Sequence, residues 1–141
     1  MFKTIVLGLD GSDNSKRAIA PAVELANKDG GRIVIAHVDE RVAGKGGAAS
    51  LHADEDEVRA GIQEEADRIS ADGVDAKVEN AVAILGGPAH AIAEIADEVD
   101  ADVIVVGTRG HSQVAGLMLG SVTNRLLHIA NRPVLGIPPS D

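Results

Sequence analysis

The chain has 141 residues, of which 45% are apolar and only one is aromatic, and its 22 acidic and 13 basic residues give a formal net charge of −9. This length and aliphatic content predict a single domain over residues 1–141. The lack of cysteine excludes a disulfide scaffold, a cysteine-ligated zinc site and a cysteine nucleophile.

Partners and location are also constrained by the composition. Proteins that bind single-stranded nucleic acids usually combine aromatic rings with a basic groove, so this acidic chain is a poor partner for nucleic acid polymers. The apolar run 4–9 is too short and too weakly basic at its flank for a signal peptide, and no stretch approaches the roughly 18 apolar residues of a spanning helix. We therefore expect a soluble cytoplasmic protein without a membrane partner.

Short apolar runs alternate with helical patterns along the chain. The strands are predicted over 4–9, 32–38, 74–84, 102–107 and 132–138. The helices are predicted over 14–28, 54–71, a segment that opens at 86–88 and continues to about 99, and 121–130. Pro21 falls inside the first helix, where it is expected to kink the axis, and the glycine-rich stretch 41–53 is a predicted mobile loop.

This alternation indicates an α/β fold with an open five-stranded parallel sheet and helices on both faces. Polar residues interrupt the run 74–84, which favours a position at the edge of the sheet. In such sheets a ligand lies beyond the carboxyl ends of the strands, where the strand order reverses. The loops after the first, second and fourth strands are therefore the candidate binding site.

The segment 107–121 carries the clearest binding signal. Gly107 follows a buried strand and lets a ligand approach the backbone, and Arg109 adds a permanent charge. Gly120 and Ser121 stand at a helix N-terminus, where free N–H groups favour a phosphate. The alternative interpretation is ordinary turn chemistry, with Ser121 as an N-cap. Neither a Walker A loop nor a Gly-x-Gly-x-x-Gly motif is present.

The spacing Gly107-x2-Gly110-x9-Gly120-Ser121 is similar to the nucleotide-binding signature of the universal stress protein family. The segments 5–12, 102–107, 119–122 and 132–135 also resemble that family, so the resemblance spans residues 4–138. It implies a Rossmann-like sheet in the order 3-2-1-4-5 and a nucleotide across the ends of the first, second and fourth strands. ATP, with Mg²⁺, is the ligand implied, although some members prefer cyclic AMP.

The resemblance also implies roles for single residues. Asp10, beside Gly11 in the first turn, would lie near the ribose, and Val38 would contact adenine through its backbone. Gly107, Gly110, Gly120 and Ser121 would cradle the ribose and phosphates. The further candidate contacts with the ligand are Gly11, Arg109, His111 and Val122. Asp10 could instead cap the following helix.

Other ionisable residues receive structural interpretations. His37 lies in a strand and is expected to be a hydrogen-bonded core residue, and the acids from Asp54 to Asp67 are expected to form a solvated helix face. His52, His90 and His128 are scattered, so no structural metal site is predicted.

The function implied is that of an ATP-binding regulator or sensor of the stress response, with no catalytic residue assigned. A slow ATPase or phosphotransferase, a protein that binds cyclic AMP, and an interaction protein with a vestigial pocket are the alternatives. The last strand is short and apolar. Members of the family that this chain resembles form dimers through their last strand. A homodimer is therefore predicted.

Overall fold

The computed structural model of the chain describes residues 2–39, 48–82, 87–109 and 120–139. Five strands form one parallel sheet in the order β3-β2-β1-β4-β5, as predicted. The strands are β1 (Thr4–Gly8), β2 (Arg32–Asp39), β3 (Asp75–Val82), β4 (Val103–Gly107) and β5 (Val134–Ile137). The edge position of β3 is confirmed, and its side chains are largely exposed, in contrast to the wholly buried β4.

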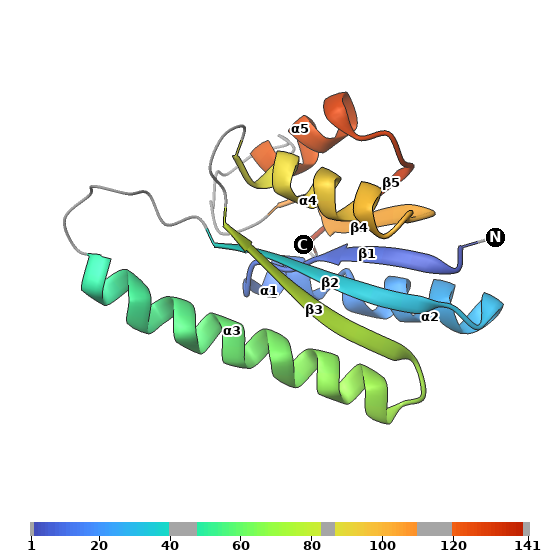
Figure 1. Cartoon of the computed structure of the whole chain (residues 1–141), viewed down its shortest axis with the longest axis horizontal. Helices are drawn as coiled ribbons and strands as arrows, with labels where there is room; N and C mark the ends of the chain where they lie inside the picture. The colour runs from blue at the N-terminus through green and yellow to red at the C-terminus, as the bar shows by residue number, and fades with distance from the viewer. Residues whose placement is uncertain (1, 40–47, 83–86, 110–119, 140–141) are drawn as a thin grey trace.

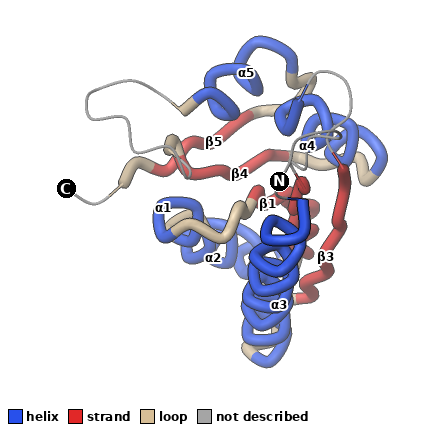
Figure 2. The backbone as a smooth tube through the Cα atoms, turned by 90° about the vertical axis from the view of Figure 1, so that its left-hand side faces the viewer, coloured by secondary structure: helices blue, strands red, loops and turns tan. Residues whose placement is uncertain are grey.

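Five described helices cover the two faces of the sheet. They are α1 (Asp13–Lys16), α2 (Ile19–Asp29), α3 (Ala48–Ala71), α4 (Gly87–Glu98) and α5 (Ser121–Ile129). The helices α1, α2 and α3 lie on one face, and α4 and α5 lie on the other (Figures 1 and 2).

Alternating side chains of the central strands build two aliphatic cores. Ile5 and Leu7 of β1 point toward α2 and α3, whereas Val6 between them points toward α4 and α5. Successive side chains of a strand face opposite sides, so apolar runs such as 4–8 and 103–107 are buried on both faces. This construction explains why β1 after Thr4 and the whole of β4 contain no polar side chain.

The predicted single helix over 14–28 is wrong, because the chain forms two helices there. Ser12 caps α1 by accepting a hydrogen bond from the Ser15 backbone at 3.1 Å, and α1 ends at Lys16. A new helix, α2, begins at Ile19, which places Pro21 in its first turn. Proline is tolerated there because the first N–H groups of a helix lack partners within the helix.

The second correction concerns the start of α3. This helix begins at Ala48 and not at Asp54, so residues 48–53, expected in the loop, are helical. Residues 41–47 lie outside the described part of the chain, and the mobility of the loop stays a prediction. Alanine at three of the positions 48–53 favours helix.

Candidate functional site

A cavity of about 320 Å³ lies where β1, β2 and β4 end. It is walled by the ends of these strands, by α1 and α3, and by the N-terminal parts of α4 and α5. Its lining residues are Gly8, Leu9, Asp10, Ser15, Ala36, His37, Val38, Glu55, Val58, Pro88, Ile92, Val106, Gly107, Arg109, Gly120, Ser121, Val122 and Thr123. This is the edge of the sheet at which parallel α/β folds bind ligands.

The turn after β1 places an acidic side chain in the cavity wall. The Asp10 carboxylate accepts a hydrogen bond from the Ser12 backbone N–H at 2.8 Å. The cap of α1 is therefore Ser12, so the alternative that Asp10 itself caps this helix is wrong. The neighbouring Gly11 has a φ of +85°, a backbone angle that residues with a side chain rarely adopt. Gly11 does not line the cavity.

Two glycines allow close backbone approach around the end of β4, Gly107 toward α1 and Gly120 toward Thr108. A Cβ atom at Gly107 would lie 2.8 Å from the Asn14 carbonyl oxygen, and one at Gly120 would lie 2.9 Å from that of Thr108. The Gly120 N–H donates to the Thr108 carbonyl. These contacts leave no room for a side chain, so the backbone itself forms this wall of the cavity.

The N-terminus of α5 opens at this wall. Gly120 is the N-cap and makes no side-chain capping bond, and Ser121 is the first helical residue. The interpretation of Ser121 as the N-cap is therefore wrong. The first N–H groups of a helix point away from its body and carry partial positive charge, so this end can accept an anion.

Four ionisable side chains form a cluster at the end of β2. The His37 ring lies between the Leu9 carbonyl, 3.2 Å from Nδ1, and Oε1 of Glu55, which contacts Nε2. Arg59 lies 3.4 Å from Oε1 of Glu55 and 3.6 Å from Oδ2 of the buried Asp39. His37 is a hydrogen-bonded core residue, as predicted, and it also lines the cavity.

The structure brings most of the predicted site residues together. Seven of them line the cavity: Asp10, Val38, Gly107, Arg109, Gly120, Ser121 and Val122. Gly110 and His111 lie outside the described residues. The roles of these residues toward a ligand stay predictions.

Several lining residues were not predicted from the sequence. They are Ser15, Glu55, Val58, Pro88, Ile92 and Thr123, among others. Glu55 is the most consequential, because it belongs to the helix face that we expected to be solvated, yet its side chain is only 16% exposed. Its neighbours give no signal of this in the sequence, since His37 is 18 residues away.

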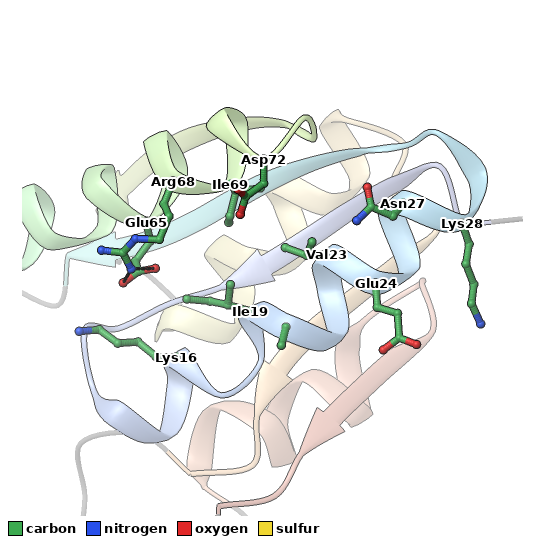
Figure 3. A pocket seen from close by; sticks show the side chains of 11 residues that line it. Lys16, Ile19, Val23, Glu24, Asn27, Lys28, Glu65, Arg68, Ile69 and Asp72 are labelled. Carbon is green, nitrogen blue, oxygen red and sulfur yellow. Dashed lines mark hydrogen bonds and ion pairs between the residues drawn. The ribbon is translucent and has the colours of Figure 1, made fainter.

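A wider hollow lies between α2 and α3, away from the strand ends (Figure 3). Its volume is about 830 Å³, and its floor is formed by apolar side chains such as Ile19, Val23 and Ile69. Charged residues surround them, including Arg68 paired with Glu65. This hollow contains none of the predicted site residues, so the cavity at the strand ends is the better candidate site.

Two absences hold for the part of the chain that the structure describes. None of its helices is both long and apolar enough to cross a membrane. This part of the chain also contains no group of three or more histidines and acids arranged to hold a metal ion.

The family model described as the universal stress protein family matches residues 1–138. The chain belongs to the universal stress protein family. A family member from Thermus aquaticus is 37% identical over 138 residues, which cover 96% of this chain and 98% of that protein.

Two solved universal stress proteins resemble the structure. One, in complex with cyclic AMP, is 32% identical, with a TM-score of 0.70 over 99% of this chain and 98% of the other. The second, from Archaeoglobus fulgidus and in complex with dAMP, is 25% identical, with a TM-score of 0.72 over 97% and 98% of the two chains. Both bound molecules are adenine nucleotides.

Proposed function

We propose that this universal stress protein binds an adenine nucleotide, with ATP as its ligand, in the cavity at the ends of β1, β2 and β4. One observation carries the proposal: a single cavity combines a backbone wall at a helix N-terminus with an aliphatic slot. The first suits phosphates and the second suits a base. The two similar structures with bound cyclic AMP and dAMP support this choice of ligand class.

The phosphates are assigned to the wall formed by Gly107, Gly120 and the start of α5. An acidic protein repels polyanions through its overall field, so the attraction must be local. Helix N–H groups supply part of it, and the Arg109 guanidinium, also in the cavity lining, supplies a full positive charge. Mg²⁺ carried by ATP would neutralise further phosphate charge, and the Asp10 carboxylate and Ser121 hydroxyl are oxygen ligands of the kind it prefers.

The adenine is assigned to the slot near the end of β2. Leu9, Val38, Val58 and Ile92 offer aliphatic surface there. The chain has no Trp or Tyr on which a base could stack, so aliphatic side chains would hold the ring faces. Backbone groups near Val38 would meet the edge of the ring.

Calorimetry with purified protein tests this proposal. We expect saturable binding of Mg-ATP. We also expect denaturation of the purified protein to release an adenine nucleotide, which mass spectrometry identifies. Titration with cyclic AMP tests the second candidate ligand, which the similar structure with cyclic AMP favours. Absence of binding to ATP, AMP and cyclic AMP alike would contradict the proposal.

The proposed role is that of a stress-response regulator or sensor in the cytoplasm, acting as a homodimer that pairs through β5. The alternative of slow ATP hydrolysis is tested by phosphate release that scales with protein concentration. Gly120→Val is the control, because its side chain would crowd the Thr108 carbonyl and displace the phosphate wall. Phosphate release equal in both proteins would point to a contaminant.

A further inference from the structure

The His37 ring fixes the position of Glu55 in the cavity wall. A backbone carbonyl can only accept a hydrogen bond, so Nδ1 of His37 must carry hydrogen and donate to Leu9. Nε2 faces Oε1 of Glu55, so the ring lies between the Leu9 carbonyl and this carboxyl oxygen.

Arg59 links the same oxygen atom of Glu55 to Asp39. The Arg59 guanidinium lies 3.4 Å from Oε1 of Glu55, and its other end faces Asp39, whose side chain is 1% exposed. Arg59 thus lies between the carboxylates of Glu55 and Asp39. Oε1 of Glu55 thus contacts His37 and lies within ion-pair distance of Arg59.

The second oxygen of Glu55 is different. Both contacts of the carboxylate use Oε1, and no hydrogen bond reaches Oε2 from any residue that the structure describes. A carboxylate oxygen has two lone pairs and accepts hydrogen bonds strongly. Glu55 therefore brings an available acceptor to a cavity wall, on a side chain whose orientation is already fixed.

We propose that Glu55 is a specificity-determining residue whose Oε2 accepts a hydrogen bond from the nucleoside part of the ligand. This inference rests on the proposed nucleotide binding. The ligand group that Glu55 would recognise is a hydrogen-bond donor, either the exocyclic amine of the base or a ribose hydroxyl. A phosphate is excluded as the partner, because it offers acceptors and negative charge to a carboxylate. The phosphate wall, moreover, belongs to β4 and α5, whereas Glu55 adjoins β2.

Calorimetry with ATP analogues separates the two sources of the donor. Purine riboside triphosphate lacks the exocyclic amine, and 2′-deoxy-ATP and 3′-deoxy-ATP each lack one hydroxyl. Each dissociation constant is compared with that of ATP for the wild type, Glu55→Ala and Glu65→Ala. Glu65 is a matched control, since it lies on the same helix and is also 16% exposed, but it pairs with Arg68 outside the cavity.

We expect one analogue to bind the wild type about tenfold or more weakly than ATP, as for the loss of a hydrogen bond to a charged group. We call the ratio of the analogue's dissociation constant to that of ATP the gap. In Glu55→Ala this gap is expected to shrink below about threefold, because the acceptor is gone. Glu65→Ala is expected to keep the full gap. The analogue concerned identifies the donor.

If Glu55 had a purely structural role, its substitution would weaken the binding of ATP and of all analogues by the same factor. That result would overturn the inference. Should Glu55→Ala fail to fold by circular dichroism, Glu55→Gln retains the size and one oxygen, and is expected to narrow the gap part-way. An unchanged gap in either folded variant overturns the inference, as do equal affinities of the wild type for ATP and all analogues. In these cases ATP still binds, whereas failure of the proposed function would abolish ATP binding itself.

Discussion

The Thr123 hydroxyl donates a hydrogen bond to the Gly107 carbonyl at 2.7 Å, and both groups are buried. This bond joins the first turn of α5 to the last residue of β4. The two elements that form the proposed phosphate wall are thereby held together by a side chain that also lines the cavity.

We expect Thr123→Val to destabilise the fold by about 1–3 kcal/mol, because it removes a buried hydrogen bond while keeping the shape of the side chain. Binding of ATP should weaken as well, since the helix N-terminus loses its tie to the strand. Chemical denaturation and calorimetry measure the two effects. Thr123→Ser keeps the hydroxyl and is expected to retain most of both properties. Equal loss in Thr123→Ser would contradict the assigned role of the bond.

Gly120→Ala should disturb the phosphate wall. Its φ of −61° is normal for any residue, so the cost comes from crowding of the new Cβ atom against the Thr108 carbonyl, 2.9 Å away. We expect a loss of about 1–3 kcal/mol in the free energy of unfolding, together with weaker ATP binding.

Gly61→Ala is the matched control for Gly120→Ala. Gly61 lies within α3, and a Cβ atom there would meet no other atom within 4 Å. Alanine is the better helix former, so we expect a gain of about 0.5–1 kcal/mol and unchanged ATP binding. Similar ATP affinities of the two variants would show that the contact at Gly120 is unimportant for the ligand.

The start of β1 predicts a pH dependence of stability. The backbone N–H groups of Thr4 and Lys3, each 2.9 Å from Oδ2 of Asp102, hold the pKa of this carboxyl below its ordinary value of 3.8. The unfolded chain therefore binds its proton more readily than the folded chain does. The stabilisation is present above pH 3.8 and is lost as the pH falls through the lower pKa of the folded state.

Asp102→Asn tests this linkage. We expect its melting temperature to lie below that of the wild type at neutral pH, and the difference to shrink as the pH falls below 3.8. Thermal melts of both proteins across this range measure the difference. A difference that does not change with pH would argue against the charge of Asp102 as the cause.

The edge strand β5 predicts how the proposed homodimer forms. Leu135 is 39% exposed in β5, and a lysine there would place a charge on the pairing edge. We expect the wild type to sediment as a dimer at micromolar concentration and Leu135→Lys to sediment as a monomer. Val82→Lys, at an exposed apolar position of the opposite edge strand β3, should remain dimeric. A wild-type monomer would refute the dimer.

The sequence by itself determined the strands and their parallel direction, whereas their order was predicted from the family resemblance. Continuous apolar runs such as 103–107 can only be buried on both faces, and alternating helices require parallel strands with crossovers. The rule that ligands bind at the carboxyl ends then located the site, and the glycines that follow β4 indicated a backbone wall. Sequence patterns reach such features because each depends on neighbouring residues.

Only the tertiary structure decided which distant side chains meet. The break between α1 and α2, the cap at Gly120 and the start of α3 depend on local energies too similar for patterns to separate. In the sequence, nothing distinguishes Glu55 from the other acidic residues of a polar helix. Only the packing of α3 against the end of β2 places it beside His37. A residue pair 18 positions apart leaves no periodic signal, because the fold, and not the chain, sets that distance.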